Sequence, residues 1–460
     1  MSYIAPQWRR RDRRLVLLHD LINHFRWRTR LTLWLTAALA GLVVAGFAVL
    51  SDQAQHAFLR LVAFNPLCAW LLPVVVPMLA VWLTRRYFPG SQGSGIPQAI
   101  AAIRLSSERQ PVHQLVSLRI AVGKILVGCF GLLGGISAGR EGPSVQVAAS
   151  IMHAAHRWLP HGRAIRPQDL ILAGSSAGIA AAFNTPLAGI VFAVEEMGRR
   201  LESRTSGVLL STIILSGLMA ISLLGNYSYF GSLHIPALSS AIVTPIIVCG
   251  IGCGLLGALF SRAMLWPQRY AGSRLWRWRA VHPVRFAGLC GLLLALMGWL
   301  SGGSSFGSGY AATSHLIDGS ATLPWHAPLL RFGATLVTYF MGVPGGIFAP
   351  SLAVGAGIGN DLASWFFPLA GQHVIIALCM ASFLAAVTQA PLTSAIIMME
   401  MIDNHGMVIS LMAACVLARF ISARISPALY HQLSEGFMSP PARQDERPVR
   451  AQIDPPPAGP

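Results

Sequence analysis

The sequence predicts an all-α polytopic membrane protein, and three observations support this fold class. Hydrophobic residues make up 54% of the 460 residues and charged residues only 11%, a balance too apolar for a soluble protein of this length. Glycine and proline interrupt many of the apolar segments, which is typical of membrane proteins whose broken helices are buried in protein or line a cavity. Windows long enough to cross or nearly cross a bilayer recur at 33–50, 66–84, 113–136, 206–225, 241–260, 283–300, 325–342, 372–388 and 405–420.

The net charge of +17 is carried by short basic clusters at the ends of these windows, which indicates membrane topology rather than nucleic-acid binding. The cluster Arg9–Arg14 precedes the first window, and the arginine-rich linker Arg262–Arg285 lies between two later ones. Both are expected on the cytoplasmic side. The linker 225–240 has no Lys or Arg and is expected outside. We expect both chain termini to be cytoplasmic.

The chain divides into a basic amphipathic lead at 1–31, a membrane domain at 32–435 and a Pro-rich, disordered tail at 436–460. Neither a signal peptide nor an appended soluble regulatory domain is expected. The seven cysteines lie within or beside apolar windows and form no CxxC pair. They therefore indicate neither disulfides nor a metal site, and no cofactor is expected.

An internal repeat divides the membrane domain into two halves, at about 65–225 and 240–422. Three pairs of segments match in the same order along the chain: Gly139–Val147 with Gly346–Val354, Ala180–Glu195 with Ala385–Glu400, and Gly93–Gly95 with Gly307–Gly309. Paired interruptions in two halves are typical of transporters built from repeats. The sequence alone leaves open whether the halves are inverted relative to each other.

The motif Gly139-Arg140-Glu141-Gly142-Pro143 predicts an anion site at a helix start. Proline at the first helical turn loses no hydrogen bond, and the amides of Arg140 to Gly142 would point outward unpaired. Free amides and the helix dipole attract anions. Glu141 places a carboxylate at the same point, where it competes with the anion when charged and carries a proton when neutral.

Two further motifs offer similar donors. Gly93-Ser94-Gly95-Ile96-Pro97 supplies a hydroxyl and free amides, although a simple loop at the end of a span would also explain it. Gly346-Ile347-Phe348-Ala349-Pro350 offers helix-start amides at Ile347 and Phe348. Neither motif contains a fixed positive charge that would trap the anion.

Several charged residues lie in or beside the apolar windows. Arg140 is expected to have a role separate from Glu141, because adjacent residues do not face each other on a helix. Lys124 either balances a buried carboxylate or biases the local potential toward anions. Glu195 has a repeat counterpart in Glu400, so Glu196 is the extra acid and a candidate for function. A solvated helix end would also explain the two glutamates.

Two motifs have structural explanations from sequence alone. Tyr430 fits a tyrosine of the interfacial aromatic belt. Gly174-Ser175-Ser176-Ala177-Gly178 fits G-x-S-x-G, so an intramembrane serine hydrolase using Ser176 is the remote alternative function. That motif requires a strand-to-helix turn and triad partners, which this segment lacks. Its small residues favour close helix packing instead, and the chain is not expected to be an enzyme.

As a set, the three glycine-rich motifs and Tyr430 resemble the CLC family of chloride channels and proton-coupled chloride exchangers. The resemblance implies a homodimer in which each subunit has its own pore and two inverted halves of tilted, partial helices. By the match, chloride is bound by the hydroxyls of Ser94 and Tyr430 and by the amides of Ile347 and Phe348. Glu141 matches the external gating glutamate, and Glu196 matches the internal proton-transfer glutamate of the exchangers.

The resemblance therefore implies a secondary antiporter that exchanges chloride for protons in a bacterial inner membrane, with chloride, protons and membrane lipid as its partners. A passive voltage- or pH-gated chloride channel of the same fold is the main alternative. Ser94 matches chloride-preferring members, because nitrate-preferring ones carry proline at that position. The three motifs also differ from those of the fluoride-exporting branch.

Overall fold

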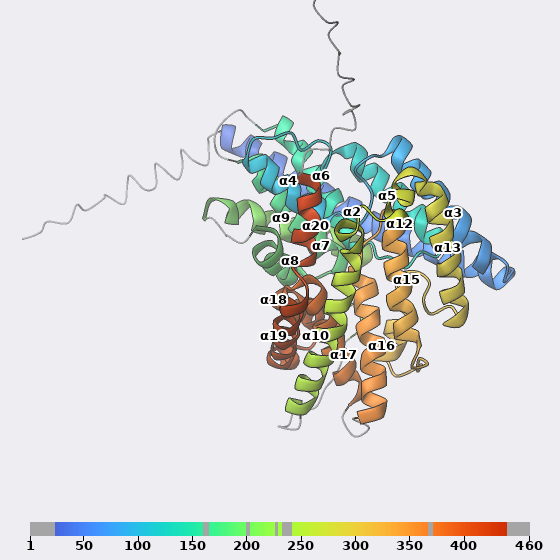
Figure 1. Ribbon diagram of the computed structural model, residues 1–460. Helices are drawn as coiled ribbons and strands as arrows, with labels where there is room; N and C mark the ends of the chain where they lie inside the picture. Colours follow the sequence, from blue (N-terminus) through green and yellow to red (C-terminus); the bar gives the residue numbers. More distant parts are fainter. Residues whose placement is uncertain are drawn as a thin grey trace, which may run out of the picture.

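The computed structural model describes residues 24–159, 165–198, 203–225, 229–231, 242–366 and 371–438. Within these ranges the regular structure is helical, and the extended pairing consists of two isolated β-bridges (Figure 1). The all-α membrane fold predicted from composition is confirmed. In chain order the helices are α2 (His24–Phe64), α3 (Cys68–Tyr87), α4 (Ile96–Ser107), α5 (Leu118–Leu133), α6 (Glu141–Ala154), η1 (Ala155–Arg157), α7 (Pro167–Phe183), α8 (Pro186–Phe192), η2 (Ala193–Gly198), α9 (Ser203–Leu224), α10 (Val243–Met264), α11 (Trp266–Arg269), α12 (Arg274–Val281), α13 (Pro283–Leu300), α14 (Tyr310–Ile317), α15 (Ala327–Met341), α16 (Phe348–Phe366), α17 (Gln372–Thr388), α18 (Pro391–Met401), η4 (His405–Met407), α19 (Val408–Ile425) and α20 (Leu429–Met438).

Six helical segments within the described residues are long and apolar enough to cross a membrane: 27–64, 68–87, 206–224, 243–264, 283–300 and 405–425. The windows expected at 113–136, 325–342 and 372–388 form the shorter helices α5, α15 and α17, of 16, 15 and 17 residues. Glycines and prolines break the apolar pattern into these partial helices. Helices this short fall below the roughly 20 residues needed to span the hydrocarbon core, so they end inside the protein.

Three expected boundaries need correction or lie partly outside the described ranges. Helix α2 begins at His24, so the end of the lead at 1–31 belongs to that helix, and residues 1–23 lie outside the described residues. Helix α20 continues to Met438, so the tail does not begin at 436, because α20 still packs against α4 there. Most of the linker 225–240 also lies outside the described residues.

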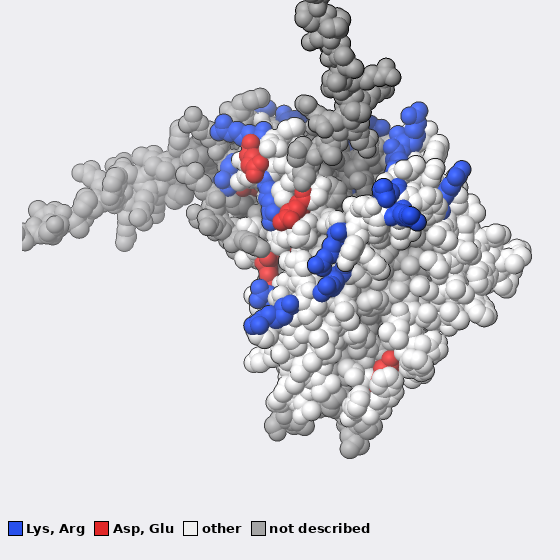
Figure 2. Space-filling view, in the orientation of Figure 1, with Lys and Arg blue, Asp and Glu red and all other residues white. Residues whose placement is uncertain are grey.

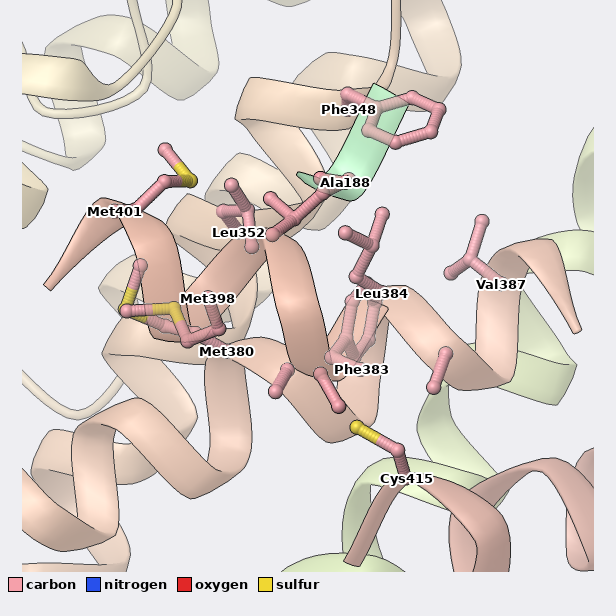
Figure 3. Packing of buried hydrophobic residues seen from close by; sticks show 14 of the residues in the cluster. Ala188, Phe348, Leu352, Met380, Phe383, Leu384, Val387, Met398, Met401 and Cys415 are labelled. Carbon is pink, nitrogen blue, oxygen red and sulfur yellow. The ribbon is translucent and has the colours of Figure 1, made fainter. Parts of the chain in front are cut away.

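The largest apolar core surrounds the starts of α8 and α16. Figure 3 shows Phe348 and Ala188 on one side of this core, with Leu352 and Leu384 next to Ala188 and with Met398 farther away beside Met380. Helices α10, α15 and α16 run side by side along one face of the molecule (Figure 1). This packing fixes the position at which α16 begins, and that position is one side of the candidate site.

The G-x-S-x-G segment lies wholly within α7, where it is buried. The Ser175 and Ser176 hydroxyls donate to the carbonyls one turn earlier, at 2.8 and 3.0 Å. A Cβ added at Gly174 or Gly178 would lie 2.6 Å from a carbonyl oxygen of α6. The strand-to-helix turn that a hydrolase requires is absent here, and the glycines permit close packing of α7 on α6.

Candidate functional site

Short backbone contacts join the three glycine-rich motifs. Gly139 and Gly346 exchange a pair of hydrogen bonds, at 2.8 and 2.7 Å. The Gly93 amide donates to the Val343 carbonyl at 3.2 Å, and the Gly345 amide donates to the Gly93 carbonyl at 3.1 Å. Segments far apart in the sequence thus meet at one point, where α4, α6 and α16 each begin. The sequence predicted donors at each motif separately, and the fold brings them together.

Glycine is required where the motifs touch. A Cβ added at Gly142 would collide with the Ser94 hydroxyl and would lie 3.3 Å from the Gly346 Cα. Gly95 precedes α4 with a φ of +102°, in the left-handed region that favours glycine. The glycines therefore let three helix starts approach one another with their amides directed to a common space.

Two hydroxyls and two buried helix-start residues lie at this junction. Among the described residues, the Ser94 and Tyr430 hydroxyls are buried and have no hydrogen-bond acceptor or donor within normal geometry. The Tyr430 ring is 0% exposed and stacks on Phe348 with centroids 6.0 Å apart. Ile347 and Phe348 are buried where α16 begins. The interpretation of Tyr430 as an interfacial belt residue is wrong, because α20 packs it against α4 and the core.

Glu141 is the first residue of α6, and its side chain is 1% exposed. The Tyr229 hydroxyl donates to one carboxylate oxygen at 3.4 Å, and the other oxygen has no hydrogen-bond donor among the described residues. Arg140 turns away, forming an ion pair with Asp52 at 2.5 Å and donating to the Ala48 carbonyl at 2.8 Å. Arg140 and Glu141 therefore have different partners, and the separate roles expected of them stay a prediction. A small cavity of about 10 Å³, room for roughly one water, lies between Asp52, Arg140, Glu141 and Tyr229.

Tyr229 was missed by the sequence analysis, which assigned it to an external linker. Its side chain is 5% exposed and packs edge-on against Phe183 and Tyr310. The Tyr310 hydroxyl donates to the Tyr229 carbonyl at 2.9 Å, and the Phe230 amide donates to the Met401 carbonyl at 2.9 Å. These contacts fix the tyrosine over Glu141. The linker showed no hydrophobic period that would have signalled burial.

Glu196 lies in the π-helical turn η2 and is 3% exposed, so the interpretation of a solvated helix end is wrong for it. Glu195 has a different environment, because its carboxylate accepts from the Leu392 amide at 3.1 Å and from the Thr393 amide and hydroxyl at 2.7 Å each. Glu195 therefore caps the start of α18.

Lys124 is fully buried on α5 and contacts the loop that carries Ser94. Its ammonium donates to the carbonyls of Gln92, at 3.4 Å, and of Gly93. Its described partners are thus carbonyl oxygens rather than the buried carboxylate that the sequence allowed. A cation that binds the carbonyls of a loop raises the local potential for anions on the opposite, amide side.

The junction combines amides, two hydroxyls and a buried carboxylate, with a second buried carboxylate in η2. Helix-start amides and hydroxyls can replace the hydration of a small anion without a full positive charge. A carboxylate that competes for the same donors can exchange places with that anion. The donor set therefore suits weak, reversible anion binding coupled to protonation.

The comparisons with known proteins agree with this arrangement. The family model for the voltage-gated chloride channel matches residues 76–423. The chain is 31% identical to the H(+)/Cl(-) exchange transporter ClcA of Cronobacter sakazakii, over 90% of this chain and 91% of the relative. It is 30% identical to the ClcA exchange transporter of Yersinia pseudotuberculosis, over 91% and 90% of the two chains.

Solved structures with a similar fold include two antiporters. The crystal structure of a slow cyanobacterial Cl-/H+ antiporter matches with a TM-score of 0.78 and 26% identity, over 89% of this chain and 98% of the other. A CLC-type fluoride/proton antiporter matches with a TM-score of 0.73 and 24% identity, over 90% and 99%. The second likeness concerns the fold alone.

Proposed function

The chain belongs to the voltage-gated chloride channel (CLC) family, and from this premise we propose that it is a secondary antiporter exchanging chloride for protons. It is a multi-pass membrane transporter and not an enzyme. The relatives from Cronobacter sakazakii and Yersinia pseudotuberculosis, which match over most of their length, are both named as exchange transporters. A passive channel of the same fold is the alternative that the experiment below must exclude.

One observation carries the proposal: two glutamates of the membrane domain, Glu141 and Glu196, are both buried, with exposures of 1% and 3%. An ionisable residue inside a membrane domain is costly unless it has a function. A channel needs one gating carboxylate, whereas proton exchange needs a second acid that carries the proton to the other side. The burial of Glu196 supports this second role.

In the proposed mechanism, chloride binds between the Ser94 and Tyr430 hydroxyls and the amides of Ile347 and Phe348. An anion next to Glu141 favours the neutral form of that side chain, since like charges repel. Neutral Glu141 no longer competes for the amides and leaves the site, and chloride passes. The proton then moves inward to Glu196. The two fluxes are coupled because both require Glu141.

Chloride, rather than fluoride, is proposed as the substrate anion. Ser94 offers a buried hydroxyl that can donate a hydrogen bond to an anion. Relatives at 30% and 31% identity carry chloride in their names, while the fluoride/proton antiporter shares the fold at 24% identity. Replacing external chloride with fluoride in the assay below tests this directly. Faster fluoride transport would reverse the assignment.

The experiment uses purified protein in liposomes with a chloride gradient and no pH gradient, recording external chloride and pH together. The exchanger is expected to drive protons uphill, opposite to chloride. Glu141→Gln and Glu196→Gln should each abolish proton movement and leave chloride flux. Glu108→Gln, at the exposed end of α4, is the matched control and should leave both fluxes unchanged. Coupled proton pumping retained in Glu141→Gln would refute the mechanism.

We also propose that the two halves, about 65–225 and 240–422, are inverted relative to each other. Glu195, after α8, accepts hydrogen bonds from the start of α18, and Glu400, within α18, accepts from the Leu187 and Ala188 amides at the start of α8. Such reciprocal contacts are expected of two equivalent helices that run antiparallel. The reciprocity supports a two-fold relation between the halves.

A homodimer in the bacterial inner membrane, with residues 1–23 and 439–460 in the cytoplasm, completes the proposal. Ile409, Val416 and Phe420 are exposed and lie at helical spacing on one face of α19, and this is the face that we propose for the contact between subunits. Light scattering in detergent should give twice the mass of one chain. Replacing Ile409 and Phe420 together by Trp should shift it toward one chain, and an unchanged mass would place the contact elsewhere.

A further inference from the structure

A groove of about 880 Å³ lies between α10, α13 and α15, next to the segment that carries α11 and α12. Its walls are apolar and aromatic, and its outer rim carries exposed leucines from α10 and α13. The inner wall is an aromatic cluster in which Trp276 packs against Phe286 and Phe340. The groove is separate from the glycine-rich junction and has no part in the proposed exchange of chloride for protons.

One end of the groove is positively charged. Arg262, in the last turn of α10, and Arg269, in α11, both line it, and no Asp or Glu does so among the described residues. Neither arginine has an ion-pair partner in the part of the chain that the structure describes. Arg279, by contrast, is held in place, because its Nε donates to the Phe340 carbonyl at 2.8 Å. Figure 2 shows Lys and Arg gathered over the upper ends of α10 and α12, with largely uncharged surface below them.

We propose that this groove binds an anionic phospholipid of the surrounding bilayer. The acyl chains lie along Leu259, Leu289 and Leu293, and the phosphate binds Arg262 and Arg269. Acyl chains match an apolar groove that opens to the membrane, and guanidinium groups form paired hydrogen bonds with phosphate oxygens. The exposed rings of Trp266 and Tyr270 line the same end. Rings of this kind are enriched at the depth of lipid headgroups, which places the arginines at the phosphate level.

The bound lipid would contact the helix that leads into the glycine-rich junction. Val337 and Phe340, near the end of α15, form one wall of the groove. Only Gly342 separates α15 from Val343, whose carbonyl accepts from the Gly93 amide. Packing against Phe340 therefore acts on the position of the loop that carries Ile347. An effect on transport rests on the proposed function, whereas lipid binding itself does not.

The test is native mass spectrometry of the purified protein in neutral detergent, titrated with phosphatidylglycerol or, as the neutral reference, phosphatidylcholine. We expect tight phosphatidylglycerol adducts on the protein and weaker phosphatidylcholine adducts. Arg262→Ala with Arg269→Ala should weaken phosphatidylglycerol binding roughly 30-fold, about fivefold per arginine near a headgroup. Arg274→Ala with Arg277→Ala removes the same charge from α12 outside the groove and should bind normally.

Leu293→Trp fills the apolar part of the groove and should also weaken binding, with both arginines intact. Equal binding of the two lipids, or equal loss in the two arginine double variants, would overturn the proposal. Displacement of phosphatidylglycerol by inorganic phosphate would identify a simple anion site and also overturn it. A second copy of this chain could also occupy the groove. In that case the lipid-free protein would be a dimer that dissociates when Arg262 and Arg269 are both replaced, and this result would overturn the proposal too. Because the readout is binding, these outcomes are independent of chloride and proton flux.

Discussion

Removing the Tyr229 hydroxyl tests whether this residue holds the gating carboxylate in place. Tyr229→Phe keeps the ring that packs on Phe183 and Tyr310 but deletes the donor to Glu141. In the conformation described, the Glu141 side chain is 1% exposed and its carboxylate lies beneath Tyr229 at the junction. Loss of the hydrogen bond should favour conformations in which the carboxylate has left and chloride has replaced it.

The magnitude follows from the geometry of this hydrogen bond. Hydrogen bonds to charged groups contribute about 1.5–3 kcal/mol, and a separation of 3.4 Å is long for O–H···O, so about 1 kcal/mol is expected here. This corresponds to roughly a fivefold change in an equilibrium constant. Since carboxylate and chloride compete, the apparent affinity for chloride should rise roughly fivefold. Isothermal titration calorimetry of the purified protein at fixed pH measures this apparent affinity for chloride.

A double-mutant cycle separates a contact with Glu141 from a general change in packing. In the Glu141→Gln background the competing charge is gone, so Tyr229→Phe should leave the apparent chloride affinity within about twofold. Tyr87→Phe, which removes a hydroxyl from an exposed tyrosine at the end of α3, should have no effect in either background. A gain of equal size with and without Glu141 would refute the reasoning, because the hydroxyl would then act through the loop alone.

Three further changes test the site and its supports. Glu195→Gln removes the charge that caps α18, and the free energy of unfolding in detergent should fall by about 1–3 kcal/mol; an unchanged thermal midpoint would count against the cap. Lys124→Met leaves two loop carbonyls without their buried donor, so the affinity for chloride should fall and the free energy of unfolding should fall by about 2–4 kcal/mol. A chloride affinity and an unfolding free energy equal to those of the unchanged protein, both measured by calorimetry, would refute this. Gly142→Ala should abolish anion flux in liposomes, because its Cβ would collide with Ser94, whereas Gly207→Ala on α9 meets open space and should transport normally; flux that survives Gly142→Ala would contradict the packing.

The sequence predicted most of the fold because membrane proteins carry their signals locally. Apolar length indicates spans, and proline and glycine mark helix starts, so the amides at Glu141 and Phe348 could be anticipated without a structure. Glu196 has no counterpart in the second half, which makes it a candidate for function, and its side chain is buried. These signals need only a few neighbouring residues.

Other features depend on contacts between distant segments, which local patterns do not encode. Tyr430 looked like an interfacial tyrosine because nothing nearby in the sequence shows that α20 returns to the junction. Tyr229 lies in a segment without periodicity, and its burial comes from contacts with Tyr310 and Met401. The partner of Arg140, Asp52, is on α2, far from the motif in sequence. Each is a tertiary contact rather than a property of its own segment.

The correspondence between the halves extends to two buried cations that differ in type. Arg331 precedes Gly346 by the same number of residues as Lys124 precedes Gly139, so the two cations occupy matching positions in the two halves. Like Lys124, Arg331 is buried against a glycine-rich loop. Its guanidinium donates to the carbonyls of Phe306 and Gly307, at 3.0 Å each. A comparison of motifs missed it because lysine and arginine occupy the two positions. In both halves a buried cation therefore binds backbone carbonyls of the glycine-rich loop.

The two loops nevertheless differ in what they leave available for an anion. In the second half, the Ser308 amide and hydroxyl both donate to Gln55, at 3.2 and 3.1 Å, so the donors of that loop are already used. In the first half, the Ser94 hydroxyl has no such acceptor among the described residues. The loop and its buried cation are therefore purely structural in the second half, whereas in the first half they leave the Ser94 hydroxyl available to an anion. This difference accounts for a single proposed chloride site in a chain built from two related halves.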